Sequence, residues 1–387
     1  MTCYLVLGLF AGAWAALIPD LKAQIGATDG ELGFALLFFG IGAIPAMLLT
    51  GRIWRTTGWL LLPLAGFLFA LTMLGPVFAT SPIAFGIAAM LVGAGSGVLD
   101  VSMNAAVSDV EANRGVRLMF GAHALFSLGV LVSAVSTGFA RELGAQPIHV
   151  LGSVALVTAV VAAASISSAR AGSRFHASAP PATGSASLGA AITILAALCA
   201  LAFLVEDALQ NWSALQIERG LGAGPALGGA APGVFAGAMF AGRILGQRLG
   251  GRFTDRALLS GGSLAAAVGA AILSVAPNPI VALAGLAVAG AGISTIAPAL
   301  FARAGRMTDP AGRAAAIARV TSLGYSGFVF GPALVGIVAQ LTDLRTAIAL
   351  LAALALTMAV SGAYVLRRGD QSGTFAEGEE LLRTSRG

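Results

Sequence analysis

The amino-acid sequence predicts an all-α polytopic membrane protein whose twelve transmembrane helices form two six-helix pseudo-repeated bundles. Three observations predict this fold class. Of the 387 residues, 57% are hydrophobic and only 10% are charged, whereas soluble domains carry about 25% charged residues. Apolar runs of roughly 18 to 25 residues, long enough to span a bilayer, recur along the whole chain. A weak internal repeat relates the two halves.

Twelve apolar segments separated by turn signals are the predicted transmembrane spans. Turns are indicated at 26–30, 80–82, 277–279 and 342–343 by clusters of Gly, Pro, Asn, Asp, Ser and Thr. No basic region precedes the first apolar run, so we expect no cleavable signal peptide. The spans lie at residues 3–19, 31–50, 60–78, 83–108, 118–139, 148–168, 188–210, 226–246, 258–276, 280–302, 315–340 and 346–366.

Basic residues are distributed unevenly over the loops. One alternating set of loops is rich in arginine, and the other holds only Lys22, Arg141, Arg219 and Arg345. The positive-inside rule therefore places the rich set and both termini in the cytoplasm. The near absence of lysine, against twenty-one arginines, is typical of a GC-rich bacterial genome. The basic residues form no continuous patch, which argues against a nucleic-acid partner despite the net charge of +5.

The longest polar interruption, residues 169–187, is rich in Ala, Ser, Pro and Gly and is typical of a flexible linker. It divides the chain into an N-terminal six-helix bundle at 1–168 and a C-terminal six-helix bundle at 188–366. Residues 367–387 are a predicted cytoplasmic tail, and the linker is predicted to be cytoplasmic as well.

Polar side chains interrupt the fourth and fifth apolar segments. Asp100 and Asn104 are four residues apart, so they share one helix face. His123 lies on the next segment, beyond a charged turn centred near residue 113. Counted outward from that turn, Asn104 and His123 fall at nearly equal depth. A carboxylate, an amide and an imidazole are therefore expected to meet inside the membrane, where ionisable groups by default mark a functional site.

Each of these three residues has a functional and a structural interpretation. Asp100 is a candidate for proton coupling, because a carboxyl group in a low-dielectric setting is protonated more easily than in water, or it is a structural acid bonded to Asn104 or to backbone. His123 could bind substrate or relay a proton, since imidazole titrates near neutral pH, or it could hydrogen-bond Asn104 between helices. Asn104 is expected to be a structural partner or a polar lining of the cavity.

Glu206 and Asp207 are adjacent in the seventh span, toward its outer end. Adjacent residues project about 100° apart on a helix, so we expect one to line a cavity and the other to face a neighbouring helix. Both are candidates for proton coupling, with an outer gate as the alternative. Gln210, four residues after Glu206, extends the same face and is a cavity candidate.

Four tryptophans have mainly structural interpretations. Trp14 lies mid-span and either stacks on a sugar ring or packs between helices. Trp212, Trp54 and Trp59 lie near the predicted membrane interfaces, where tryptophan commonly anchors the chain.

Helix breaks and intramembrane arginine supply candidates for conformational change. Gly331-Pro332 removes a backbone hydrogen bond and is expected to kink the eleventh span. Arg243, near the inner end of the eighth span, either reaches the interface with its long side chain or pairs with an acid across the two halves.

The internal repeat is visible in short glycine motifs. Gly93-Ala94-Gly95 recurs as Gly290-Ala291-Gly292, and Gly51-Arg52 has an apparent counterpart in Gly242-Arg243. Such repetition is typical of secondary transporters, which bind substrate at the midplane between their halves. At this offset Asp100 matches Ala297 and His123 matches Val320. The predicted polar cluster therefore belongs to the N-terminal half alone.

These residues resemble the major facilitator superfamily across essentially the whole chain. Gly97-Val-Leu-Asp100-Val-Ser-Met-Asn104 followed by His123-Ala-Leu-Phe-Ser-Leu-Gly129 is similar to the fucose-permease-like branch and its poorly characterised bacterial inner-membrane members. Further matches are Ile18-Pro-Asp-Leu-Lys22, Asn211-Trp-Ser-Ala214, Gly324-Tyr-Ser-Gly327 and Gly331-Pro332.

The resemblance implies alternating-access transport, which in the sugar permeases is proton symport. It implies that the carboxylate at Asp100 takes part in coupling and that the residue at His123 faces the sugar. It makes Asn211 and Tyr325 further candidates for the substrate cavity. The candidate gating residues are Arg52, Arg55, Arg243, Gly331 and Pro332.

The sequence also departs from the family pattern. Ala15 stands where sugar symporters carry an acid in the first span, Arg55 where the second-to-third-span motif has an aspartate, and Gln247 where an acid is common in the eighth-to-ninth loop. The fourth span lacks the arginine, and the fifth lacks the Gly-Pro motif, of drug–proton antiporters. These absences count against drug efflux.

The leading hypothesis is a secondary active transporter that moves a small polar, sugar-like solute, coupled to protons. The alternative is an exporter of drugs or amphipathic metabolites. An enzyme is not expected, because HExxH and nucleophile–base motifs are absent from the sequence. We expect no metal, no cofactor apart from the proton gradient as driving ion, and structural roles for Cys3 and Cys199. The expected partners are a small-molecule substrate and the lipid bilayer, and the expected state is a monomer.

Overall fold

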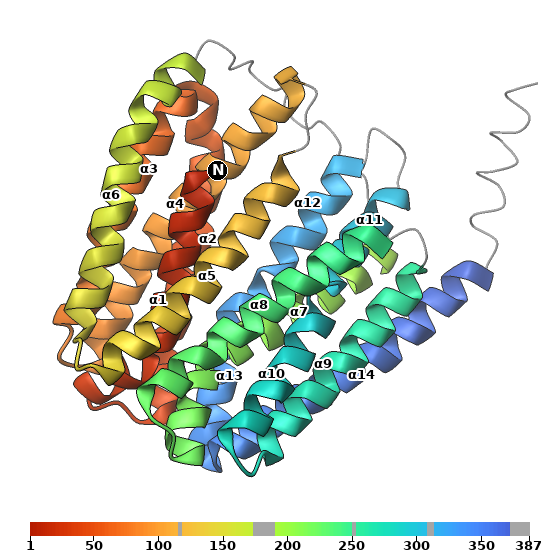
Figure 1. The fold of residues 1–387 in the computed structure, drawn as a ribbon. Helices are drawn as coiled ribbons and strands as arrows, with labels where there is room; N and C mark the ends of the chain where they lie inside the picture. The colour runs from red at the N-terminus through yellow and green to blue at the C-terminus, as the bar shows by residue number, and fades with distance from the viewer. Residues whose placement is uncertain (115–117, 173–189, 250–252, 308–312, 372–387) are drawn as a thin grey trace, which may run out of the picture.

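The chain forms a bundle of long helices in the computed structural model, which describes residues 1–114, 118–172, 190–249, 253–307 and 313–371. Figure 1 shows two groups of helices side by side, with α5 beside α8 and α2 beside α13 where the groups meet. The N-terminal group comprises α1 (Thr2–Gln24), α2 (Asp29–Thr57), η1 (Gly58–Leu60), α3 (Leu61–Thr72), η2 (Gly75–Phe78), α4 (Pro82–Arg114), α5 (Met119–Glu142) and α6 (Pro147–Gly172).

The C-terminal group repeats this plan with two of its spans broken. We name the side that carries Met1 and the α2–α3 connection the terminal side, and the opposite side, with the α1–α2 and α7–α8 connections, the far side (Figure 1). The group comprises α7 (Ala190–Leu215), η4 (Gln216–Gly220, a π-turn), α8 (Pro225–Leu249), α9 (Asp255–Val275), α10 (Pro279–Ile293), α11 (Ile296–Arg306), α12 (Arg313–Gly324), α13 (Ser326–Leu341) and α14 (Leu344–Gln371).

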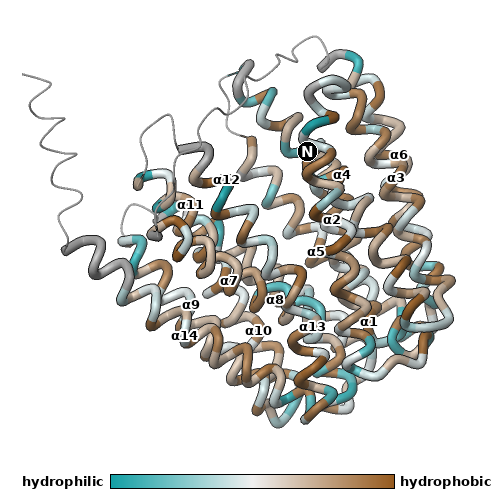
Figure 2. The backbone as a smooth tube through the Cα atoms, turned by 180° about the vertical axis from the view of Figure 1, so that it is seen from behind, coloured by the Kyte–Doolittle hydropathy of each residue, from teal (hydrophilic) through white to brown (hydrophobic). Residues whose placement is uncertain are grey.

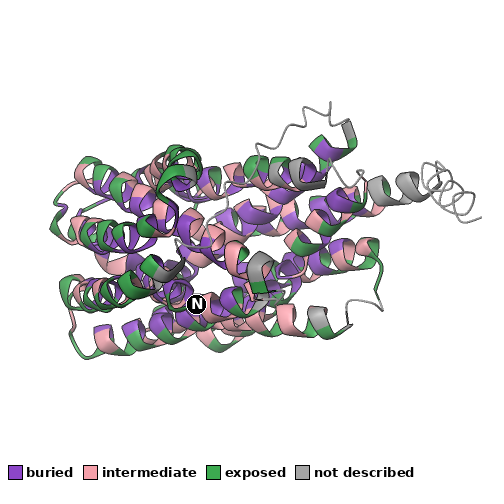
Figure 3. Ribbon diagram, turned by 90° about the horizontal axis from the view of Figure 1, so that it is seen from above, coloured by how far each residue is buried: buried purple, intermediate pink, exposed green. Residues whose placement is uncertain are grey.

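The predicted twelve-helix membrane fold is confirmed. Among the described residues, eleven helical stretches are long and apolar enough to cross a membrane. The remaining predicted span corresponds to α8. This helix has 25 residues and is long enough to cross a membrane at 1.5 Å per residue, but its glycines, prolines and arginines make it less apolar. Figure 2 shows hydrophobic residues along the middle of the helices. Figure 3 shows exposed residues around the rim and buried ones between the helices, as expected for a surface in contact with lipid.

Several predicted turns start helices through side-chain caps. Thr28 begins α2 in a capping box, in which its hydroxyl accepts the Glu31 N–H at 3.2 Å and the Glu31 carboxylate accepts the Thr28 N–H at 2.8 Å. Asn278 begins α10 by accepting the Val281 N–H at 3.0 Å. These caps satisfy amide groups that would otherwise lack a partner at the helix ends.

Two spans that the sequence predicts as continuous are interrupted. The tenth is divided into α10 and α11 at Ser294 and Thr295, and the eleventh into α12 and α13 at Tyr325. Gly331-Pro332, where we expected a kink, lies inside α13, which continues through Pro332. The interruption of the eleventh span lies beside Gly324, where an added Cβ would stand 2.7 Å from the Cys199 sulfur of α7.

The glycine repeat marks equivalent close contacts in the two halves. A Cβ on Gly93 of α4 would lie 1.9 Å from the carbonyl oxygen of Phe39 on α2, and a Cβ on Gly290 of α10 would lie 2.4 Å from that of Phe235 on α8. Each glycine therefore lets the fourth helix of its half approach the second helix at backbone distance.

The second proposed repeat pair was wrong. Gly242 packs against α10, where a Cβ would lie 2.9 Å from the Ala291 carbonyl oxygen, whereas a Cβ on Gly51 would have no atom within 4 Å. Arg52 is exposed near the end of α2, while Arg243 lies within the bundle and contacts other helices. Similar dipeptides thus occupy different environments.

Candidate functional site

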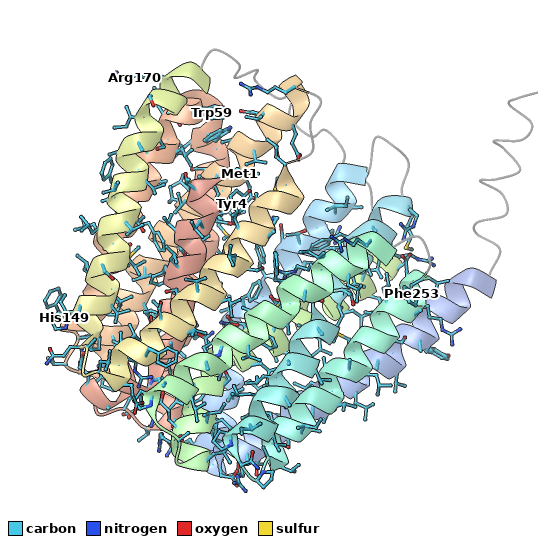
Figure 4. The ribbon with its side chains drawn as sticks, in the orientation of Figure 1. Met1, Tyr4, Trp59, His149, Arg170 and Phe253 are labelled. Carbon is cyan, nitrogen blue, oxygen red and sulfur yellow. The ribbon has the colours of Figure 1, made fainter. Side chains whose placement is uncertain are left out.

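The polar cluster predicted on the fourth and fifth spans forms around a residue of the first. Asn104 donates its amide to the Asp100 carboxylate at 3.0 Å and to the Asp100 carbonyl oxygen at 2.8 Å. The Tyr4 hydroxyl donates to the Asn104 carbonyl oxygen at 2.8 Å. The Tyr4 ring meets the His123 ring edge-on, with centroids 5.4 Å apart. We name Tyr4, Asp100, Asn104 and His123 the N-terminal polar cluster; Figure 4 labels Tyr4 near the start of α1.

Tyr4 lies between Asn104 and His123. A hydrogen bond between these two residues was one of the alternatives for His123, but among the described residues each contacts Tyr4 instead. The Tyr4 ring is fully buried and fills the space between α4 and α5, while His123 is exposed. The cluster therefore presents an imidazole on an open surface and holds a carboxylate through an amide.

The seventh span carries a second acid–amide pair with the same geometry. Asn211 donates its amide to the Asp207 carboxylate at 3.0 Å and to the Asp207 carbonyl oxygen at 3.0 Å. This second pair lies on the seventh helix and not at the repeat equivalent of the fourth, where Ala297 and Val320 stand opposite Asp100 and His123.

Glu206 faces helix α8, whereas Asn211, the hydrogen-bond partner of Asp207, lies on the same helix α7. A Glu206 carboxylate oxygen lies 3.6 Å from the Arg243 guanidinium of α8. Arg243 also donates to the Ser127 hydroxyl of α5 at 3.1 Å. The acid partner of Arg243 belongs to its own half of the molecule, and the contact across the halves is with a serine.

A buried arginine joins the two halves on the far side. Arg141, at the end of α5, donates two hydrogen bonds to Asp20 of α1 at 2.6 and 2.7 Å and two to Glu218 of η4 at 2.6 and 3.0 Å. A fifth goes to the Ala16 carbonyl oxygen at 2.8 Å. Only 2% of the Arg141 side chain is exposed. We name Arg141, Asp20 and Glu218 the far-side lock.

Further contacts close the same side. Asp29 pairs with Lys22 and with Arg219, each at 2.9 Å, so it links α1, α2 and η4. Backbones also touch directly, since a Cβ on Gly229 of α8 would lie 2.4 Å from the Cα of Gly138 on α5. The far side is therefore held by ion pairs and by helix contact without intervening side chains.

Polar contacts described on the terminal side join helices of the same half. The Trp59 indole donates to Asp109 at 3.1 Å. The Glu111 carboxylate accepts the Leu118 amide at the start of α5, and Asp255 pairs with Arg306. The described polar contacts therefore join the two halves on the far side but join helices of the same half on the terminal side.

The remaining cavity candidates are placed as follows. Tyr325, at the start of α13, stacks on Phe203 with ring centroids 5.8 Å apart, and it lies within electrostatic range of Asp100 across the two halves. Trp14 is 6% exposed and stacks on Phe85 at 5.7 Å, which favours its packing interpretation. The Gln210 amide nitrogen is buried without a hydrogen-bond partner among the described residues.

Candidate gating and anchoring residues are placed less uniformly. Trp212 is fully buried, so its predicted role as a membrane anchor was wrong; helix α7 continues past it and turns it into the core. Gly331 packs on α7, where a Cβ would lie 2.7 Å from the Leu204 carbonyl oxygen. The side chains of Arg55 and Gln247 lie outside the described residues.

Sequence reasoning missed Tyr4, Ser127 and the far-side lock. A usable signal was present: Arg141 is one of the few basic residues in the arginine-poor set of loops, and Asp20 and Glu218 lie near the same side. The repeated Asp-x-x-x-Asn spacing at 100–104 and 207–211 was a second signal. Among the described residues, no group of three His, Cys, Asp or Glu side chains is placed to hold a metal ion.

Comparison with known proteins gives a consistent family assignment. The sequence profile of the Major Facilitator Superfamily matches residues 1–283 and 195–386. An uncharacterised MFS-type transporter of Yersinia pestis is 34% identical over 371 residues, covering 94% of each chain. The membrane protein MosC of Rhizobium meliloti is 28% identical over 369 residues, covering 93% of this chain and 88% of MosC.

Solved structures share the fold at low sequence identity. The nucleoside transporter NupG superposes with a TM-score of 0.74 at 12% identity, covering 94% of this chain and 97% of NupG. A D-xylose–proton symporter superposes with a TM-score of 0.72 at 14% identity, covering 93% of this chain and 94% of the symporter.

Proposed function

Because this multi-pass membrane protein belongs to the major facilitator superfamily, whose members are transporters and not enzymes, we propose that it carries a small polar, sugar-like solute in symport with protons. The observation that supports coupling most directly is the Asp100 carboxylate, held by Asn104 inside the membrane. A carboxyl group in this setting can load a proton on one side and release it on the other, as a symporter requires.

The far-side lock supports alternating access as the mechanism. Asp20 and Arg141 belong to the N-terminal group and Glu218 to the C-terminal group, so this lock has to open whenever the far side opens. The arginine distribution supports an orientation in a bacterial inner membrane with the far side toward the periplasm and both termini in the cytoplasm. The structure would then represent a state closed toward the periplasm. We propose that one chain is the working unit and that the proton gradient is its driving force.

The sugar-like nature of the cargo draws on two supports. The motifs around Asp100 and His123 resemble the fucose-permease-like branch. The structures sharing the fold include a D-xylose–proton symporter and a nucleoside transporter. His123, Tyr325 and Asn211 are the proposed lining of the cavity, together with Asn104 and Gln210.

The test uses purified protein in liposomes with an imposed proton gradient. Radiolabelled D-galactose, L-fucose, D-xylose and D-galacturonate are the cargo panel. We expect concentrative uptake of at least one compound, abolished by a protonophore. Asp100→Asn should retain counterflow exchange and lose concentrative uptake, because it cannot release a proton.

Asp343→Asn is the matched control. Asp343 lies in the α13–α14 turn, where hydrogen bonds from Thr346 hold its pKa below the ordinary aspartate value, and asparagine can also cap a helix. Undiminished concentrative uptake by Asp100→Asn would remove this residue from coupling. Efflux of amphipathic compounds without uptake of any panel member would favour the exporter.

A further inference from the structure

Arg243 has more hydrogen-bonding capacity than its neighbours use. A guanidinium group carries five N–H donors in a planar fork. Among the described residues, Arg243 makes one hydrogen bond, to Ser127 at 3.1 Å, and one ion pair, to Glu206 at 3.6 Å. A separation of 3.6 Å exceeds the length of a hydrogen bond. Because 35% of the Arg243 side chain is exposed, its remaining donors can be reached by a ligand.

The position of Arg243 is central to transport. It extends from α8 of the C-terminal group to Ser127 on α5 of the N-terminal group. Ser127 lies one helical turn after His123, which is exposed and within electrostatic range of Arg243. A group bound here would touch both halves of the molecule at once, as a cargo must in an alternating-access carrier.

We propose that Arg243 is the receptor for an oxyanion on the cargo, a carboxylate or a phosphate ester, and that Glu206 is its counterion while the site is empty. The inference rests on the proposed transport function and specifies the cargo of that site. A guanidinium fork binds carboxylate or phosphate through two parallel hydrogen bonds. Glu206 makes no such bond, so an incoming oxyanion can gain an interaction that the protein has left unformed.

The other intramembrane acids are less available to a charged ligand. The Asp100 and Asp207 carboxylates each accept a hydrogen bond from an asparagine four residues later. They would be the receptors of a cationic cargo, and this is the competing outcome of the experiment below. The anionic class is favoured because Arg243 is partly exposed and only loosely paired.

The experiment measures melting temperature of the detergent-purified full-length protein with matched ligands. D-Galacturonate and D-galactose differ only at C6, where a carboxylate replaces a hydroxymethyl group; D-glucose 6-phosphate and D-glucose provide a second pair, and D-galactosamine tests a cation. A ligand that binds the native state raises the melting temperature by mass action. We expect an anionic member to stabilise the protein more than its neutral partner.

Variants assign the effect to Arg243. Arg243→Gln should weaken anion binding roughly tenfold to a hundredfold, the loss expected for charge-assisted hydrogen bonds. Arg243→Lys keeps the positive charge but lacks the planar fork of donors, so its affinity for the anion should lie between those of the wild type and Arg243→Gln. Glu206→Gln removes the competing anion and should tighten binding. Arg256→Gln, at an exposed arginine of α9, is the matched control and should bind anions as the wild type does.

Three results would overturn the inference: no stabilisation by any anionic compound, equal stabilisation of wild type and Arg243→Gln, or stabilisation by D-galactosamine alone. Its failure is distinguishable from failure of the proposed function. If D-galactose binds and is concentrated by a proton gradient while D-galacturonate has no effect, the symporter proposal stands and the anionic class is wrong. If D-galacturonate binds through Arg243 but its uptake does not depend on the proton gradient, the anionic class stands and the proton-symport proposal is wrong.

Discussion

Arg141 and Arg243 both lie within the helical bundle and both contact the opposite half, but they are used in opposite ways. Arg141 makes five hydrogen bonds between 2.6 and 3.0 Å, and its side chain is 2% exposed. Among the described residues, Arg243 makes one hydrogen bond and a 3.6 Å ion pair, and its side chain is 35% exposed. All five N–H donors of Arg141 are used by the protein, so none is left for a ligand, whereas Arg243 has donors left.

The two arginines also suit different roles: Arg141 suits closing the far side, and Arg243 suits binding a solute. Removing one partner of a buried ion pair leaves an uncompensated charge, so all three members of the far-side lock are needed together in the closed state. A loose pair can exchange one partner for another at low cost. The tightly bonded arginine lies where the two halves meet on the far side, and the loosely bonded one lies at the proposed solute site.

The largest effect is expected from Arg141→Gln. Loss of the guanidinium leaves Glu218 and Asp20 without their cation, and we expect destabilisation of about 3 kcal/mol, the lower end for breaking a buried pair, because Asp20 is 35% exposed. The measurement compares the melting temperatures of the wild type, Arg141→Gln and, as the conservative control, Arg141→Lys. A melting temperature equal to that of the wild type would show that the far-side lock contributes nothing to the closed state.

Gly229→Leu tests closure without changing charge. A Cβ at this position would lie 2.4 Å from the Cα of Gly138, so the larger side chain should hold α5 and α8 apart on the far side. We expect a single cysteine introduced at Gly222, in the α7–α8 connection, to react faster with an impermeant maleimide in this background. Gly152→Leu, where a Cβ would have no atom within 4 Å, is the control; an unchanged labelling rate in Gly229→Leu would contradict the close-packed far side.

Ser127→Ala tests the central contact between the halves. It removes the hydrogen bond that Arg243 donates to Ser127 and is expected to cost about 1 kcal/mol, a typical net hydrogen-bond contribution. Binding of D-galacturonate should change by only a few fold, because the proposed receptor is the guanidinium group. A loss of binding as large as that of Arg243→Gln would make Ser127 part of the receptor.

The smallest effect is expected from Arg219→Gln. Arg219 is 55% exposed and shares Asp29 with Lys22, and exposed ion pairs contribute at most about 1 kcal/mol. We expect a change in melting temperature close to the error of the measurement and no change in the labelling rate at the far side. A loss comparable to that of Arg141→Gln would mean that the second bridge, through Asp29, carries the closure.

Composition and periodicity predicted most of the fold. Apolar runs of membrane length fix the helices, because a backbone in lipid must satisfy its own hydrogen bonds. Caps such as Thr28 and Asn278 mark the helix starts from local sequence alone. The interruption at Tyr325 was not predicted, since it arises where Gly324 meets Cys199 of another helix, a contact that no local pattern contains.

The candidate site was predicted in its residues but not in its pairings. Asp100, Asn104, Glu206 and Arg243 were recognised because charged and amide groups are costly in a membrane, and the Asp-x-x-x-Asn spacing by itself places each amide beside its acid. That Tyr4 joins Asn104 to His123, that Glu206 rather than Asp207 faces Arg243, and that Arg141 closes the far side were decided by the tertiary structure. These contacts join residues up to 125 positions apart in the chain, and the rotation and depth of each helix depend on packing against its neighbours, which no single helix encodes.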